Sequence, residues 1–257
     1  MKATLYLNNI NFKLFVIIIT IITTSCRGVT YIIEDIKVNN IKIADSLNVN
    51  SELESIISPF RDEIKELEKV IGYSNESLSI RDGELESTLG NLIADILIEE
   101  CNPVFNDLTT KNIDFSLFNY GGIRGNMNKG NITQHDLFTI MPFQNIAIVV
   151  KLNGSKILEL LEYLNLENIA HPISGISIEF NQNEIKAIIN GKDFNINKSY
   201  YVLTSNFLQE GGDKMIFFKE PEELYDLNLN IRDVLIYHIA NKKMISSKLD
   251  NRIKRIK

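Results

Sequence analysis

Apolar residues recur at helical intervals between residues 50 and 71, and charged residues occupy the positions between them. This spacing predicts an amphipathic helix whose polar face is a solvated surface. Pro59 lies inside the stretch, so the pattern also predicts a kink or a second helix start there. The apolar positions are Leu53, Ile57, Phe60, Ile64, Leu67 and Ile71.

A second amphipathic stretch, residues 86–101, predicts a helix that begins between Glu86 and Thr88. Gly90 lowers helix stability in its first turns, so we expect it to permit the close approach of another backbone. Cys101 ends the stretch and is expected to be a buried, unreactive thiol.

Strands and helices alternate along the rest of the chain. We expect strands at 113–119, 145–152, 175–180, 185–189 and 200–205. We expect a short helix at 132–143 that Pro142 ends, a turn at Asn153–Gly154, and helices at 155–164 and 231–240. Residues 27–50 read as an N-terminal strand and linker. The pattern as a whole predicts one α+β domain over residues 51–257 with a helical lead-in.

The first 25 residues have the composition of a secretory signal. Lys13 precedes a short apolar run, and small residues lead to Cys26. The run is too short to span a membrane comfortably. Cys26 then resembles the lipidated residue of a bacterial lipoprotein, which predicts an extracytoplasmic, membrane-anchored domain in the periplasm or on the outer membrane. The alternative is a plain signal peptide with an incidental cysteine.

The composition excludes some classes of function. The chain has 257 residues, 44% of them hydrophobic, and a formal net charge of −6, so we expect no general attraction to nucleic acid. Its three histidines lie in unrelated contexts without metal-ligand spacing to carboxylates, so we expect no metal site and no cofactor in this chain. His238 is expected to be a hydrogen-bonded core residue, and His135 and His171 to lie in polar loops.

Three loops carry groups suited to a flat, polyhydroxylated, anionic ligand. In "NYGGIRGN", Gly121 and Gly122 allow a tight bend, and Arg124 offers a planar cation that matches phosphate. Phe143 in "MPFQN" and Phe207 in "NFLQEGGDK" could sandwich a base. Asp213 could accept hydrogen bonds from vicinal sugar hydroxyls.

Taken in order, "ESTLGNLIADI", "NYGGIRGNMNKGNIT", "LFTIMPFQN" and "SNFLQEGGDK" resemble the C-terminal domain of the 5'-nucleotidases, also called UDP-sugar hydrolases. The resemblance implies a mixed-sheet α+β fold and a nucleotide-binding role. It implies that Phe143 and Phe207 stack on the base and that Asp213 binds the ribose hydroxyls. The implied substrate-binding set is Asn119, Gly122, Arg124, Phe143, Asn145, Phe207, Gly212 and Asp213.

The chain departs from the family pattern at two places. Gly83 stands where a further phosphate-binding arginine is usual, with Arg81 two positions earlier, and Lys214 and Met215 replace the residues that usually follow the Gly-Gly-Asp triplet. The metallophosphatase domain of the full-length enzymes is also expected to be missing.

These observations leave three functions open. The first is a nucleoside- or nucleotide-binding lipoprotein that hydrolyses nothing alone and works with a separate metallophosphatase, which would bring the divalent metals. The second is a non-catalytic nucleoside-binding surface lipoprotein. The third is a surface lipoprotein whose pocket has decayed.

Overall fold

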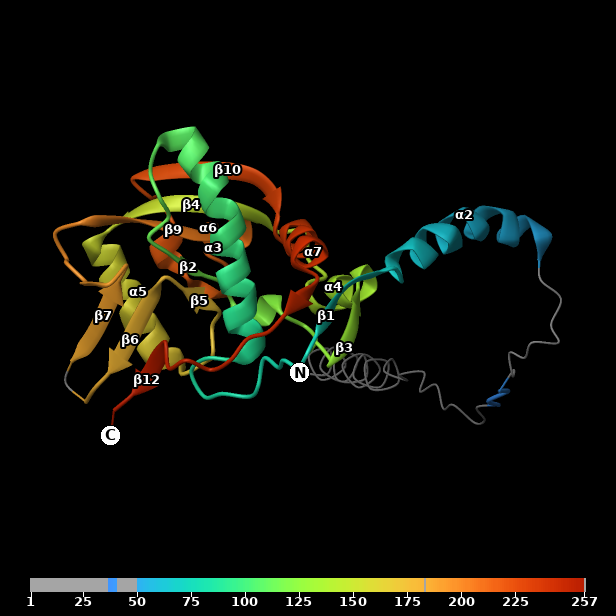
Figure 1. Ribbon diagram of the computed structural model, residues 1–257, viewed down its shortest axis with the longest axis horizontal. Helices are drawn as coiled ribbons and strands as arrows, with labels where there is room; N and C mark the ends of the chain where they lie inside the picture. Colours follow the sequence, from blue (N-terminus) through green and yellow to red (C-terminus); the bar gives the residue numbers. More distant parts are fainter. Residues whose placement is uncertain (1–36, 41–49, 183, 257) are drawn as a thin grey trace, which may run out of the picture. The chain divides into compact units, whose positions relative to one another are not determined.

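The computed structural model describes residues 37–40, 50–182 and 184–256 (Figure 1). The chain divides into two units, Met1–Asn50 and Ser51–Lys257, and every helix and strand described below belongs to the second. The expected signal segment and Cys26 lie outside the described residues, as does most of the expected strand and linker at 27–50.

A five-stranded mixed sheet forms the centre of the second unit. Its order is β10–β4–β9–β2–β5, and β2 runs parallel to β9 while the other neighbours are antiparallel. The strands are β2 (Phe115–Leu117), β4 (Ile146–Asn153), β5 (Ile173–Ser174), β9 (Ser199–Ser205) and β10 (Glu223–Asn230). The mixed-sheet α+β prediction is therefore confirmed.

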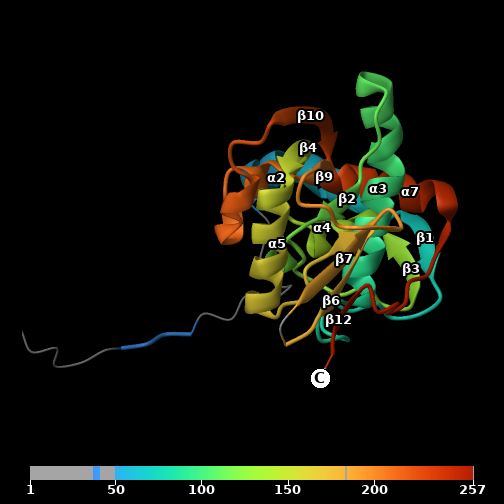
Figure 2. The same cartoon turned by 90° about the vertical axis from the view of Figure 1, so that its left-hand side faces the viewer.

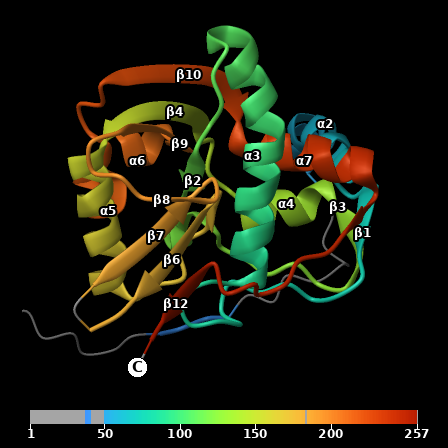
Figure 3. The ribbon, with the colours of Figure 1, turned by 60° about the vertical axis from the view of Figure 1, so that its left-hand side comes forward.

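Helices cover both faces of this sheet, which explains why β4 is apolar at nearly every position. Ala147 and Val149 pack into one core with α3 (Thr88–Thr109) and α7 (Ile231–Lys242), whereas Ile148 and Val150 pack into a second core with α5 (Gly154–Glu167). Figures 2 and 3 show the sheet between α3 and α5. Burial of each such aliphatic side chain stabilises the folded chain by about 1.5–3 kcal/mol, so the two cores stabilise the sheet from both faces.

Two smaller sheets complete the unit. One has the order β11–β1–β3 and the other β12–β6–β7–β8. The first contains β1 (Val70–Ser74), β3 (Gly130–Thr133) and β11 (Met244–Ile245). The second contains β6 (Ile176–Phe180), β7 (Ile185–Ile189), β8 (Lys192–Asp193) and β12 (Ile253–Arg255), and its buried side packs into the α5 core.

The first helix, α2 (Ser51–Leu67), is shorter than the apolar spacing predicts. Val70 and Ile71 belong to β1 instead, where Val70 pairs with Thr133 of β3. Pro59 lies inside α2, which continues as one helix, so the predicted second helix start is wrong. No residue of α2 is buried, and its apolar face is exposed.

Helix α3 begins where the sequence predicts and ends later. Ser87 is its N-cap and accepts a 3.1 Å hydrogen bond from the Gly90 amide. A Cβ on Gly90 would lie 2.6 Å from the Ser87 hydroxyl, so this glycine makes room for the cap and not for another backbone. The helix runs eight residues past Cys101, through Pro103 to Thr109.

Two further local predictions are corrected. Asn153 is the N-cap of α5, and its side chain accepts a 3.1 Å hydrogen bond from the Lys156 amide. The turn predicted at Asn153–Gly154 is therefore the start of a helix. His135 lies in the seven-residue helix α4 (Gln134–Ile140) and not in a loop. A capping box between Thr133 and Asp136 stabilises the N-terminus of this helix.

Candidate functional site

Three loops from different parts of the chain meet at one edge of the central sheet. The carboxyl ends of the parallel strands β2 and β9 lie at this edge, and antiparallel β4 begins there because Ala147 pairs with Ser205. Ends of neighbouring strands bring their loops together in space. The loops enclose a hollow of about 250 Å³, called here the loop hollow. It is lined by Asn119, Gly121, Gly122, Arg124, Phe143, Asn145, Phe207 and Asp213.

Seven of the eight residues implied by the resemblance line the loop hollow, and Gly212 does not. Gly212 instead contacts a lining residue, since a Cβ on Gly212 would lie 2.4 Å from Cε1 of Phe207. A glycine is therefore needed for the Phe207 ring to lie against this turn. Gly121 also lines the hollow, although the resemblance does not imply a contact for it.

The first wall is the turn after β2, which folds as a short 3-10 helix, η1 (Tyr120–Gly122). The Gly122 amide donates to the Asn119 carbonyl at 3.1 Å. A Cβ on Gly122 would lie 2.9 Å from Oδ1 of Asn119, so the glycine lets the buried Asn119 amide lie over the turn. Nδ2 of Asn119 donates to Oδ2 of Asp213 at 2.6 Å and joins this wall to the next.

The second wall follows α6 (Asn206–Gln209) and contains η2 (Gly212–Lys214). Gly211, Asp213 and Lys214 have φ angles of 90°, 50° and 61°. The left-handed region is unfavourable for residues with a side chain, so Asp213 and Lys214 are held there by their surroundings. The Tyr163 hydroxyl donates to the Asp213 carbonyl at 3.0 Å and is one such restraint.

The third wall is the loop between α4 and β4. It presents Phe143, which is 44% exposed, and the second aromatic residue of the hollow, Phe207, is 42% exposed. Exposed apolar residues that gather in one groove, in contrast to single ones, are typical of interaction sites. The guanidinium of Arg124 lies 5.5 Å from the centroid of the Phe143 ring, within cation–π distance, and the Arg124 amide donates to the Ile140 carbonyl at 2.8 Å.

His171 supports the first wall from behind. It lies in a loop between α5 and β5, as the sequence predicts, but the loop is buried there and not polar. It is buried, with 4% of its surface exposed, and its Nδ1 accepts from the Tyr120 amide at 3.1 Å. Burial lowers the pKa of His171 to about 4, so the ring is neutral near pH 7 and can act as an acceptor. Its ring contacts that of Tyr163 at a centroid distance of 5.8 Å.

Arg81 and Gly83 occupy the region where a further arginine is usual in the family. Nε of Arg81 donates to the Tyr120 hydroxyl at 3.3 Å. Arg81 therefore contacts the residue that lies between Asn119 and Gly121 in the sequence. A Cβ on Gly83 would lie 2.3 Å from the Glu86 carbonyl oxygen, so no larger residue fits there without a backbone shift.

A cluster of three potential metal ligands lies away from the loop hollow. Among the described residues, Glu99, Glu100 and His238 bring donor atoms within 4.8 Å of one another. These donors have protein partners: Glu99 pairs with Lys242 at 2.9 Å, and Glu100 lies 2.6 Å from Nδ1 of His238. His238 is thus the hydrogen-bonded core histidine that the sequence predicts.

Cys101 is fully buried, and burial raises the pKa of its thiol to about 12. A thiol with so high a pKa stays protonated near pH 7 and is a poor nucleophile. The prediction of a buried, unreactive cysteine is confirmed.

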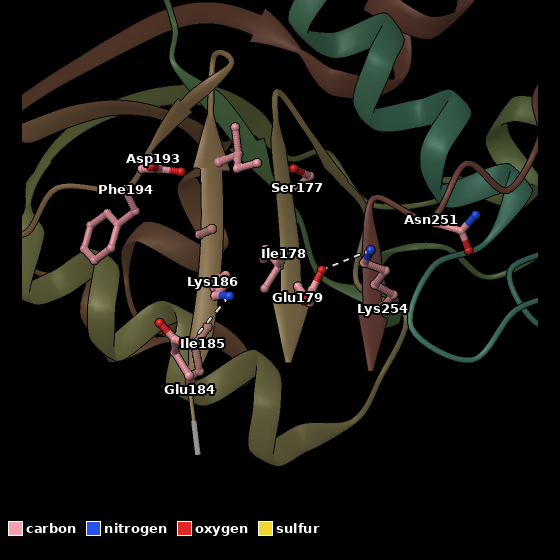
Figure 4. A pocket seen from close by; sticks show the side chains of 12 residues that line it. Ser177, Ile178, Glu179, Glu184, Ile185, Lys186, Asp193, Phe194, Asn251 and Lys254 are labelled. Atoms are coloured by element: carbon pink, nitrogen blue, oxygen red, sulfur yellow. Dashed lines mark ion pairs between the residues drawn. The ribbon is translucent and has the colours of Figure 1, made fainter. Parts of the chain in front are cut away.

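A larger hollow of about 460 Å³ lies over β6, β7 and β12 (Figure 4). Four of its charged side chains form ion pairs: Glu179 pairs with Lys254 at 3.0 Å and Glu184 with Lys186 at 3.7 Å. It shares no residue with the loop hollow.

Known proteins resemble the part of the chain that contains the loop hollow. The sequence model of the 5'-nucleotidase C-terminal domain matches residues 70–220. The trifunctional nucleotide phosphoesterase YfkN of Bacillus subtilis is 30% identical over 233 residues, covering 80% of this chain and 15% of that protein. The apyrase of Tabanus yao is 25% identical over 192 residues (66% and 34%), and the cell wall protein Lmo0130 of Listeria monocytogenes is 26% identical over 201 residues (68% and 25%). The chain thus spans about a third or less of the length of these relatives.

Solved structures show the same fold. The 5'-nucleotidase precursor from Thermus thermophilus superposes with a TM-score of 0.64 at 22% identity, over 79% of this chain and 43% of that one. The NAD nucleotidase NadN from Haemophilus influenzae gives a TM-score of 0.59 at 19% identity, over 80% and 41%.

Proposed function

The chain belongs to the 5'-nucleotidase C-terminal domain family, and from that premise we propose that it binds a nucleoside or nucleotide in the loop hollow. One observation carries the proposal: residues from three loops, far apart in sequence, gather two half-exposed aromatic rings, a carboxylate and an arginine around one cavity. These are the groups that a base, a ribose and a phosphate require.

Each group has a role that follows from its chemistry. Phe143 and Phe207 take the two faces of the base, since stacking on an aromatic ring is worth about 1–3 kcal/mol per base. Asp213 has one oxygen bonded to Asn119, and its remaining acceptor sites receive the ribose hydroxyls. Asn145 contributes a further polar contact, and Arg124 lies at the phosphate.

The size of the hollow fits a partly enclosed ligand. Its volume of about 250 Å³ is just below the usual range of roughly 300–1,000 Å³ for small-molecule sites, so part of the ligand would project from the mouth. A phosphate that projects in this way is accessible to a second protein. We therefore propose that a separate metallophosphatase supplies the divalent metals and the activated water, while this chain orients the ester.

Isothermal titration calorimetry with adenosine and AMP tests the binding. The wild-type chain should bind both, and Phe207→Ala and Asp213→Ala should each weaken binding by about tenfold or more, as expected for the loss of one stack or one charged hydrogen bond. Phe194→Ala is the matched control, because Phe194 lines the other hollow. Absence of binding by the folded wild-type chain would refute the proposed function.

Phosphate release from AMP tests the division of labour. The chain alone should release none, and a metallophosphatase from the same genome should release phosphate faster when this chain is added. A lack of stimulation, with nucleoside binding intact, would favour the second function, a nucleoside-binding surface lipoprotein without a catalytic partner.

We also propose an extracytoplasmic location with a lipid on Cys26. No helix among the described residues is long and apolar enough to cross a membrane. One relative is a cell wall protein by name, which fits a place outside the cytoplasm. Metabolic labelling with a fatty acid tests the anchor: the label should be incorporated by the wild-type chain and lost in Cys26→Ser, and an unlabelled wild-type chain would remove the anchor from the proposal.

A further inference from the structure

The first turn of α7 holds the aromatic loop of the hollow at three points. Nη1 of Arg232 donates to the carbonyls of Met141 and Pro142 at 3.2 and 3.3 Å. The Ile231 amide donates to the Asn145 carbonyl at 3.0 Å. These contacts fall on both sides of Phe143, although Ile231 and Arg232 lie 86 to 91 residues later in the chain than their partners.

The environment of Arg232 is unusual for a cation. Only 6% of its surface is exposed, and none of the ion pairs between described residues includes it. Its guanidinium stacks on the Phe138 ring at 3.9 Å, and its Nε is buried without a partner. Burial of a charge without a counter-ion is costly, so simple packing does not explain an arginine here.

The carbonyls to which Arg232 donates explain what the cation does. They lie at the end of α4, where the last carbonyl groups of a helix have no intrahelical partner. A cation is favoured at this end of a helix, and a planar guanidinium can bond two adjacent carbonyls from a fixed position. The result is a fixed conformation for the residues that immediately precede Phe143.

We propose that Arg232 is a positioning residue for the aromatic side of the loop hollow: its guanidinium fixes the Met141–Pro142 turn so that Phe143 is held ready to stack. The effect on a ligand rests on the proposed function, whereas the effect on the Phe143 side chain does not. The two can therefore be tested separately.

A ligand-free experiment tests the positioning itself. The chain contains no tryptophan, so Phe143→Trp introduces a single tryptophan into the loop, which can be excited selectively over the nine tyrosines. In the Phe143→Trp background, Arg232→Met should increase the fast local motion of the indole in a fluorescence anisotropy decay, and Arg232→Lys should increase it less. Arg252→Met is the control, because Arg252 is a largely buried arginine that bonds Asp95, Asp250 and the Ile173 carbonyl away from the hollow.

The indole of the Arg252→Met protein should move as in the parent. Equal mobility in the Arg232→Met and Arg252→Met proteins would overturn the inference, whether or not the chain binds a nucleoside. If Arg232→Met does not fold, the comparison between Arg232→Lys and Arg252→Met decides in the same way.

A ligand experiment tests the consequence. Measured by calorimetry well below the unfolding temperature, Arg232→Met should weaken adenosine binding by about tenfold, the effect of losing one well-placed stack, and Arg232→Lys by less. Arg252→Met should bind like the wild type even if its unfolding temperature is lower. If the wild type binds no adenosine, the proposed function fails; if it binds and Arg232→Met binds equally well, the positioning role fails.

Discussion

Nδ2 of Asn119 donates a 2.6 Å hydrogen bond to Oδ2 of Asp213, a residue 94 positions later in the chain. The bond joins the turn after β2 to the turn after α6 and orients the carboxylate at the loop hollow. Because one oxygen is occupied by the amide, the other acceptor sites of Asp213 are aligned before any ligand arrives. Such prior orientation lowers the entropic cost of binding.

Asp213→Asn should selectively weaken ligands that carry ribose hydroxyls. The substitution preserves shape and removes the charge, and hydrogen bonds to charged groups contribute about 1.5–3 kcal/mol, so adenosine affinity should fall roughly 10- to 100-fold. Calorimetry with 2',3'-dideoxyadenosine provides the comparison, since the wild type and the variant should bind it alike. Asp107→Asn, at an exposed position of α3, is the control. An equal loss for both ligands would contradict a contact between Asp213 and the hydroxyls.

Gly212→Ala should disturb binding more than stability. The new methyl group would lie 2.4 Å from Phe207 Cε1, so the ring must move away from the turn. We expect about a tenfold loss of adenosine affinity, comparable to the loss of one stack. Gly125→Ala is the matched control, because its nearest neighbour is the Ile140 side chain at an ordinary 3.4 Å. Titration calorimetry of the two variants checks the prediction, which fails if they bind equally well.

Lys214→Gly should stabilise the chain. The φ angle of Lys214 is 61°, where a residue with a side chain is disfavoured by about 1–2 kcal/mol and glycine is not. Glycine also makes the unfolded chain more flexible, so we expect a net gain of about 1 kcal/mol, or a rise of roughly 2–4 °C in Tm. Differential scanning calorimetry measures the change. Lys198→Gly, in an exposed turn without a positive φ, should lower Tm, and a loss of stability in both variants would refute the argument.

The elements that the sequence predicts well are those whose pattern is local. The apolar run of β4 and the final helix α7 lie within two residues of their expected bounds. A strand buried on both faces and a helix buried along one side each require apolar residues at nearby positions, so a local pattern predicts them. The three loops could be brought together only through the ordered family motifs. Neither composition nor spacing says that the ends of β2, β4 and β9 share one edge.

The elements that sequence reasoning missed depend on distant partners. Helix α3 continues through Pro103 because Phe105 is fully buried and packs on Tyr201 and Tyr225, with ring centroids 5.2 and 5.3 Å away. Val70 leaves the predicted helix because a strand is available for it to pair with. Tertiary contacts of this kind override local propensity.

The roles of His171 and Arg232 cannot be predicted from the sequence around them. Each is a buried polar side chain that bonds backbone atoms from another part of the chain, Tyr120 in one case and Met141 with Pro142 in the other. No local pattern distinguishes such a residue from an ordinary loop histidine or a surface arginine of an amphipathic helix. Their roles become visible only when the fold places them behind the hollow.

The burial of His171 makes stability depend on pH between about 4 and 6.5. Its pKa is lowered from 6.5 in the unfolded chain to about 4 in the folded one, chiefly by burial and against the opposing effect of Asp213. In this range the unfolded chain binds more protons, so stability is full above pH 6.5 and decreases as the pH falls toward 4. The expected loss between pH 7 and pH 5 is about 2 kcal/mol from this residue. His171→Gln should reduce that loss in urea unfolding at the two pH values, and His135→Gln, at an exposed histidine that pairs with Glu68, is the matched control. The same pH dependence in wild type and His171→Gln would show that His171 does not titrate in this way, and that its contact with the Tyr120 amide does not depend on a neutral ring.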